Sequence, residues 1–168
     1  LLRTPSTYDH TRPAAETYDL VVLAYAILTA MPGSPMVFQG DEWGMSGGDD
    51  PECRKPVPWP DQGPYASLND APDESFPARL SAWLRLRSDP TLGPILRFGT
   101  VEFPETTDRN VFAIRRAYEG RSVLLVANRG STTFHAVLLL RSENVTNADD
   151  DAVPPRSARL WLIEHPTP

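Results

Sequence analysis

The sequence predicts an α/β segment followed by an all-β segment, because its hydrophobic periodicity changes along the chain. Residues 14–31 carry apolar residues at helical spacing and end at Pro32-Gly33, a helix stop signal. The apolar run at residues 36–39 follows after one turn without alternation, which favours a buried strand of a parallel sheet. Beyond residue 93 the pattern becomes short β-rich runs. We therefore expect two domains, residues 1–92 and 93–168.

The first part combines two helices with a long irregular loop. Residues 14–31 are apolar nearly all round, so this helix should be buried rather than lie on the surface. Residues 40–75 are rich in glycine, proline and aspartate, and loops of this length are usually functional or disordered. Residues 76–88 return to helical spacing, with Leu80, Trp83 and Leu84 facing a core.

The second part contains four runs that predict strands, at residues 111–118, 122–128, 132–140 and 158–163. Turn residues such as Glu119-Gly120 and Arg129-Gly130 separate them. The pattern predicts an antiparallel sheet that forms one layer of a small β-sandwich. The apolar stretches 123–128 and 136–141 are expected to be its central strands.

Composition and charge exclude several classes of protein. The 168 residues include 16 basic and 22 acidic side chains, and the net charge of −6 argues against nucleic acid or an anionic membrane as a partner. The single cysteine, Cys53, forms no internal disulfide or zinc cluster, and the three histidines are scattered, so we expect no metal and no cofactor. Residues 20–30 are too short to cross a bilayer, and the first ten residues lack a secretory signal pattern. We expect a cytoplasmic protein.

Residues 32–59 contain the side chains most suggestive of chemistry. Asp50 and Arg54 lie four positions apart, with Trp43 and Trp59 on either side of them in the sequence. Carboxylates and guanidinium groups can bind sugar hydroxyls, and indole faces can pack on pyranose rings. A structural ion pair between two structural tryptophans explains the same residues. On composition alone the structural interpretation is favoured.

The ordered string PGSPMVFQGDEWGMSGGDDPECRKPVPW resembles the end of the catalytic barrel of the α-amylase family, glycoside hydrolase family 13. The cyclomaltodextrinase, neopullulanase and α-glucosidase branches are the most similar. The positions that match the family pattern are Pro32, Gly33, Pro35, Gly40, Asp41, Glu42, Gly44, Met45, Gly47, Gly48, Asp50, Pro51, Arg54, Pro56 and Trp59. The resemblance implies the last two strand–helix units of a TIM-type (β/α)8 barrel, followed by a small antiparallel β-sandwich domain. It also implies action on maltooligosaccharides or related α-glucosides, with retention of configuration in the complete enzyme.

The resemblance also implies roles for individual residues. Asp9 aligns with the third catalytic carboxylate, which stabilises the transition state, and Tyr8 and Arg12 flank it in the substrate-binding motif. Asp50 and Arg54 would hold sugars beside the cleavage site. Tyr8 stands where the family has histidine, and a phenol does not reproduce the hydrogen bonds of an imidazole.

The nucleophile and the general acid of the family stand on barrel strands that would precede Leu1. Glu42 belongs to a structural corner and is not expected to act as the nucleophile. We therefore expect no hydrolysis by the chain alone, which means no more sugar release than from an Asp9→Asn control. The remaining barrel would have to be supplied, covalently or by a partner chain. The alternative is a non-catalytic module derived from the family, which binds glucan or has a structural role.

Overall fold

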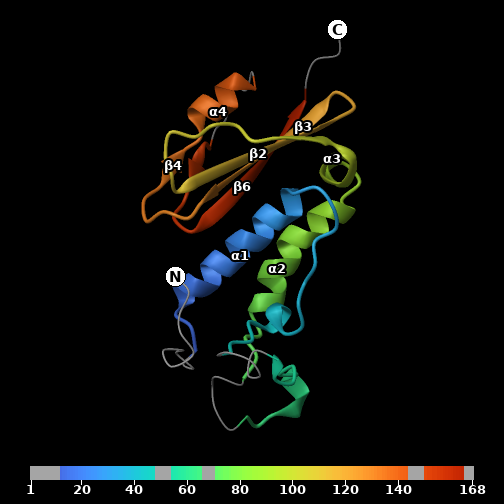
Figure 1. Ribbon diagram of the computed structural model, residues 1–168, viewed down its shortest axis with the longest axis vertical. Helices are drawn as coiled ribbons and strands as arrows, with labels where there is room; N and C mark the ends of the chain where they lie inside the picture. The colour runs from blue at the N-terminus through green and yellow to red at the C-terminus, as the bar shows by residue number, and fades with distance from the viewer. Residues whose placement is uncertain (1–11, 48–53, 66–70, 144–149, 165–168) are drawn as a thin grey trace.

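The computed structural model describes residues 12–47, 54–65, 71–143 and 150–164. A four-stranded sheet lies across one end of a pair of helices, α1 and α2 (Figure 1). The helices are α1 (Ala15–Ala30), α2 (Phe76–Leu84), α3 (Leu92–Phe98) and α4 (Val137–Ser142), with short 3-10 helices at Asp41–Trp43, Pro60–Gln62 and Arg85–Ser88. The strands are β1 (Thr100–Glu102), β2 (Val111–Tyr118), β3 (Arg121–Asn128), β4 (Phe134–His135), β5 (Ala152–Val153) and β6 (Ser157–Glu164).

The main sheet has the order β1-β2-β3-β6, and every pairing in it is antiparallel. Strands β2 and β3 form a hairpin whose two-residue turn, Glu119-Gly120, has φ values of 48° and 74°. Two positive φ values match the twist of the flanking strands, which explains why a glycine stands there. The predicted strands at 111–118, 122–128 and 158–163 are confirmed within one residue at each end.

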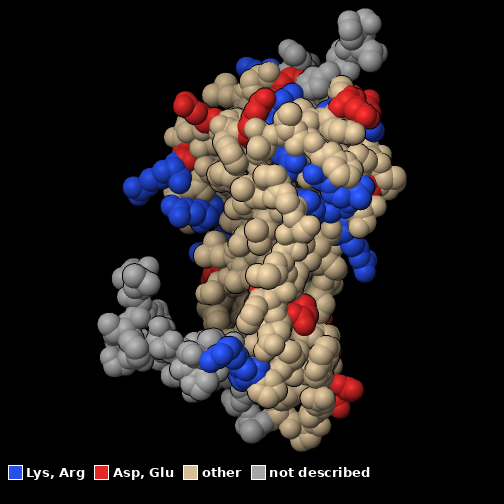
Figure 2. All heavy atoms as spheres, turned by 45° about the vertical axis from the view of Figure 1, so that its right-hand side comes forward, with Lys and Arg blue, Asp and Glu red and all other residues tan. Residues whose placement is uncertain are grey.

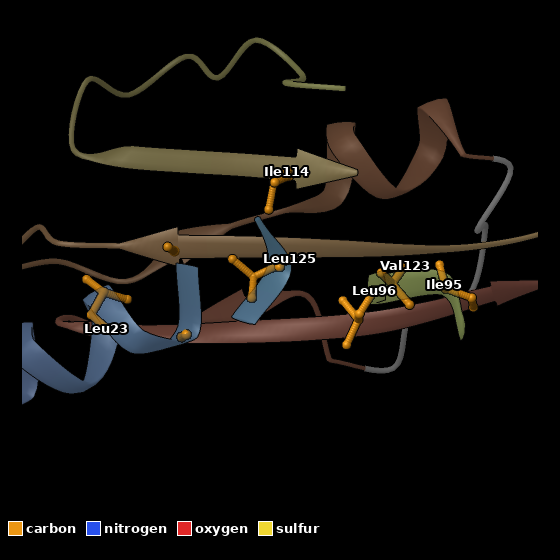
Figure 3. Packing of buried hydrophobic residues seen from close by; sticks show 9 residues of the cluster. Leu23, Ile95, Leu96, Ile114, Val123 and Leu125 are labelled. Carbon is orange, nitrogen blue, oxygen red and sulfur yellow. The ribbon is translucent and has the colours of Figure 1, made fainter. Parts of the chain in front are cut away.

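The sheet is covered on both faces. One hydrophobic core joins α1 and α3 to β2 and β3, and its labelled members in Figure 3 are Leu23, Ile95, Leu96, Ile114, Val123 and Leu125. A second core on the other side of β2 and β3 contains residues of α4 and β5. Strand β3 is buried from Ser122 to Asn128, as expected for a central strand between two layers. Each large apolar side chain buried here contributes about 1.5–3 kcal/mol of hydrophobic free energy.

Two guanidinium groups hold the C-terminal end of α1. The buried Arg116 of β2 donates to the carbonyl oxygens of Ala30 (2.7 Å), Gly99 (2.7 Å) and Thr100 (2.9 Å). Arg87 donates to the carbonyl oxygens of Thr29 (2.8 Å), Met31 (3.1 Å) and Gly33. Because the last carbonyl groups of a helix have no partner inside the helix, these bonds satisfy acceptors that burial would otherwise leave unpaired.

The expected strand at residues 132–140 is wrong. Only Phe134–His135 is a strand, and Val137–Ser142 is the helix α4. Leu139 and Leu140 are buried while Leu138 is 66% exposed, so the three leucines divide between the two sides of a helix. A short run without alternation does not distinguish a strand from a helix by periodicity. The second sheet, β4–β5, therefore has two short strands, and α4 forms much of the layer where a second sandwich sheet was expected.

The expected buried strand at residues 36–39 is also wrong. The segment is extended but belongs to no sheet, and Met36 is 75% and Phe38 50% exposed. A parallel strand is held by hydrogen bonds to neighbouring strands, and no strand of the described residues lies beside it.

Helix α1 is less buried than its composition predicts. It runs over Ala15–Ala30, close to the expected 14–31, but Leu20, Ala24 and Leu28 are exposed along one side. The sheet and α2 cover much of its remaining surface, with Tyr18, Leu23 and Tyr25 among the buried residues. Of the helices in the described residues, none is long and apolar enough to cross a membrane.

Replacing Arg116 by methionine tests the anchor at the end of α1. Methionine fills similar apolar volume but leaves the three carbonyl acceptors without their donor, so the free energy of unfolding should fall by about 2–4 kcal/mol. Urea denaturation followed by circular dichroism measures the change. The control is Arg109→Met, at an exposed position before β2, which should change the free energy of unfolding by less than about 0.5 kcal/mol. Equal losses in both variants would contradict the anchoring role.

Candidate functional site

The chain turns sharply at Gly40–Gly44, after the extended segment that follows α1. Gly40 and Gly44 have φ values of 84° and 62° and enclose the 3-10 helix Asp41–Trp43. A Cβ atom on Gly40 would lie 2.7 Å from the side chain of Met45, so neither the conformation nor the space admits a larger residue. The Met45 amide donates to the Gly40 carbonyl at 3.0 Å and closes the corner.

Two tyrosines of α1 hold this corner in place. The Tyr25 hydroxyl donates to Oδ2 of Asp41 at 2.5 Å, and the Tyr18 hydroxyl donates to the Gly44 carbonyl at 3.0 Å. Burial, together with the hydrogen bond to Asp41, raises the pKa of Tyr25. Seven residues span two helical turns, so both hydroxyls lie on one side of α1. The residues from Met31 to Gly44 run back toward the start of α1 and pass beside α2 (Figure 1). Asp41 therefore shapes the corner.

Arg12 lies beside the start of α1 in a network of polar contacts. Its Nη2 atom is 3.4 Å from Oδ2 of Asp73, and its guanidinium lies over the Tyr18 ring, 5.9 Å from the ring centroid. Hydrogen bonds from Ser75, and then the charge of Arg12, lower the pKa of Asp73 against the opposing effect of burial. The Asp73 amide donates to the Trp43 carbonyl at 2.8 Å, which connects this network to the corner.

Trp43 and Trp59 pack against each other. Their rings pack edge to face with centroids 6.3 Å apart, and Trp59 remains 46% exposed. Next to Trp59 is an open groove of about 280 Å³, and the Tyr65 hydroxyl donates to the Trp59 carbonyl. Arg54 is exposed at the start of the same stretch. The residues that line the groove are Lys55, Pro56, Val57, Pro58, Gln62 and Tyr65.

The expected site residues are only partly described. Tyr8, Asp9 and Asp50 lie outside the described residues, so their roles stay predictions. Arg12 is held beside the corner by Asp73 and Tyr18, and Arg54 lies in the stretch that leads to Trp59. The described residues contain no group of three or more His, Cys, Asp or Glu side chains that could hold a metal ion.

Sequence reasoning missed the residues that support the site. Tyr18 and Tyr25 fall within the predicted helix, and two tyrosines seven positions apart on an apolar helix are a usable signal. Asp73 and Tyr65 gave no such signal, because their partners Arg12 and Trp59 are identified only by the tertiary structure.

No family model matches the chain, but relatives are found among curated proteins. It is 29% identical over 109 residues to a cyclomaltodextrinase of Thermoanaerobacter pseudethanolicus, an alignment that covers 65% of this chain and 17% of the relative. It is 26% identical over 112 residues to a maltogenic α-amylase of Bacillus acidopullulyticus, again 65% of this chain and 17% of the relative. A shorter alignment, 49% identical over 39 residues, joins it to a cyclomaltodextrinase of Geobacillus thermopakistaniensis, with 23% of this chain and 7% of that protein covered. The resemblance to the α-amylase family is confirmed.

Solved structures agree at the level of the fold. The ligand-free cyclic α-maltosyl-(1→6)-maltose hydrolase of Arthrobacter globiformis superimposes with a TM-score of 0.66 at 24% identity, over 86% of this chain and 30% of that chain. A maltogenic amylase from S. marinus superimposes with a TM-score of 0.61 at 21% identity, over 88% of this chain and 20% of that chain. The same A. globiformis hydrolase has been solved in complex with maltose. The chain thus spans less than a third of the length of each of these α-amylase-type enzymes.

Removal of one hydroxyl tests how α1 supports the corner. Tyr25→Phe leaves Asp41 without its donor, so the free energy of unfolding should fall by about 1–2 kcal/mol. The corner should also lose protection in amide hydrogen exchange, and the Met45 amide is the reporter. Tyr118→Phe, at the β2–β3 turn, is the matched control and should leave Met45 unchanged. If both variants leave its exchange rate unaltered, Tyr25 does not hold the corner.

Proposed function

We propose that this chain forms the C-terminal part of an α-glucan-active glycoside hydrolase that acts on maltooligosaccharides or related α-glucosides. The observation that carries the proposal is the alignment of 65% of the chain with enzymes named cyclomaltodextrinase and maltogenic α-amylase. At the level of the family, these relatives point to an α-glucan hydrolase. The support from the structure is the corner, the paired tryptophans and the groove, which follow one another in the segment that resembles the barrel end.

In this proposal the chain supplies substrate-holding groups and one catalytic carboxylate. Asp9 would stabilise the positive charge that develops on the sugar ring, with Tyr8 and Arg12 beside it. Asp50 and Arg54 would bind sugar hydroxyls through charge-assisted hydrogen bonds. Trp59 would offer its exposed ring to an apolar sugar face.

The nucleophile and the general acid would come from the remainder of the barrel. Retaining glycosidases use two such carboxyl groups about 5–5.5 Å apart, one to form a covalent glycosyl intermediate and one to protonate the leaving oxygen. No described carboxylate is proposed for either role, since Asp41 accepts a hydrogen bond from Tyr25 and Asp73 pairs with Arg12.

An uncovered apolar surface supports the need for the rest of the barrel. On the face seen in Figure 2, fewer charged side chains lie over the helices than over the sheet. The exposed large apolar residues of this half include Leu20, Leu28, Met36, Val37 and Phe38. Large exposed apolar areas mark interaction sites. We infer that the neighbouring barrel strands cover these residues.

The non-catalytic alternative keeps the groove and the tryptophans but not the hydrolysis. Tyr8 in the position of the family's histidine favours it. The genomic sequence that precedes Leu1 separates the two functions, because only the hydrolase needs upstream strands with an aspartate nucleophile and a glutamate acid.

Arg54→Gln tests the sugar site directly. If the guanidinium binds glucan hydroxyls, its loss should weaken maltoheptaose binding about tenfold, as expected for one charge-assisted hydrogen bond. Isothermal titration of the wild type and the variant measures the change. The matched control is Arg109→Gln, which replaces an exposed arginine outside the groove. Equal maltoheptaose binding by all three proteins would remove Arg54 from the site.

Phe38→Ser tests the uncovered surface. In the 168-residue chain the half-exposed ring stabilises little, so the free energy of unfolding should change by less than about 1 kcal/mol while self-association decreases. In a longer polypeptide that includes the upstream barrel, the same change should cost about 3–5 kcal/mol, because the ring is then buried. Denaturation measures the free energy of unfolding, and light scattering measures self-association. A cost below about 1 kcal/mol in the longer polypeptide would exclude barrel strands as the cover.

A further inference from the structure

A second cavity, of about 350 Å³, lies between α1, α2 and the turn that joins β5 to β6. None of its lining residues belongs to the loop of the candidate sugar site. Asp19 lines it from α1, Arg79 and Trp83 from α2, and Arg156 and Ser157 from the turn and the start of β6. Its size lies within the usual range of small-molecule sites, roughly 300–1,000 Å³.

Arg156 is held in an unusual conformation at the wall of this cavity. Its φ of 50° is left-handed, a region that costs a residue with a Cβ atom energy that glycine does not pay. Its guanidinium makes no hydrogen bond or ion pair to the part of the chain that the structure describes. Nearby Arg159, in contrast, pairs with Asp150 at 2.5 Å. A strained residue with an uncommitted charged group is the kind of outlier from which function is inferred.

The other polar groups of the cavity also have hydrogen-bonding atoms without a partner among the described residues. Asp19 and Arg79 meet through one oxygen and one nitrogen, Oδ1 and Nη2, at 2.5 Å, and each side chain stays more than a third exposed. Trp83 packs against the core around α1, and its indole N–H has no partner among the described residues. The cavity therefore has two guanidinium groups and an indole donor against one carboxylate, although the whole chain has a net charge of −6.

We propose that this cavity binds a phosphate monoester of a sugar or a similar small polyol. Guanidinium forks match the oxygen acceptors of a phosphate, which Arg156 and Arg79 would share. The second carboxylate oxygen of Asp19 would accept from a hydroxyl group, and the carbon skeleton would lie against Trp83. The site is independent of the sugar site proposed above, since it uses different elements of the fold.

Two glycine substitutions test the site without disturbing the fold. Arg156→Gly removes the guanidinium and relieves the positive φ, so the thermal midpoint should stay equal or rise. Glu119→Gly makes the same backbone change at φ 48° in the β2–β3 turn, outside the cavity. In calorimetric titration of the 168-residue chain with glucose 6-phosphate, Arg156→Gly should weaken binding about 10- to 100-fold, and Glu119→Gly should leave it unchanged.

Titration with inorganic phosphate and with glucose identifies which part of the ligand is recognised. Glucose 6-phosphate should bind at least about tenfold more tightly than either, because both ends of the molecule are held. Equal affinity for inorganic phosphate would reduce the cavity to an anion site and overturn the proposal, as would equal affinity for glucose. Absence of glucose 6-phosphate binding, or binding that Arg156→Gly leaves intact, overturns it as well.

Discussion

Two guanidinium groups donate to the carbonyl groups at the end of α1. These hydrogen bonds fix where the chain leaves the helix, and the position of the candidate site depends on that exit. Arg116 reaches them from the sheet and Arg87 from the 3-10 helix that follows α2. Burial lowers the pKa of both side chains, and the charge of a neighbouring arginine adds to the effect. With its end fixed between the two layers, α1 presents one side to the sheet core and Tyr18 and Tyr25 to the corner at Gly40–Gly44.

The sheet half and the helical half of the molecule differ in how fully their apolar side chains are covered. The sheet has a hydrophobic core on each face, and β3 is buried over most of its length. The helical half ends in Leu20, Leu28 and the exposed residues 36–38, with no layer over them in the described chain. The helical half has a small core of its own around Phe76 and Leu80, but hydrophobic burial of its exposed apolar residues requires a covering surface.

The candidate site depends on the same arrangement. The corner places Trp43 against Trp59, and Arg12 and Asp73 connect the start of α1 to it. Motif spacing pointed to the corner and the tryptophans, because glycines and an ordered set of polar residues are visible in the sequence, and it predicts a role for Arg54. The supporting contacts, Tyr18 to Gly44 and Tyr25 to Asp41, join residues 26 and 16 positions apart. Sequence spacing alone does not predict contacts over such separations.

The sequence by itself determined the elements whose signals are local. The β2–β3 hairpin follows from two apolar runs around Glu119-Gly120, and α1 follows from its apolar spacing and the stop at Pro32-Gly33. Tertiary structure decided the rest, for physical reasons that lie outside each segment. Residues 137–140 are helical, and α4 buries Leu139 and Leu140 against the sheet while Leu138 stays exposed. Residues 36–39 are extended yet unpaired because a strand exists only where another strand supplies its hydrogen bonds.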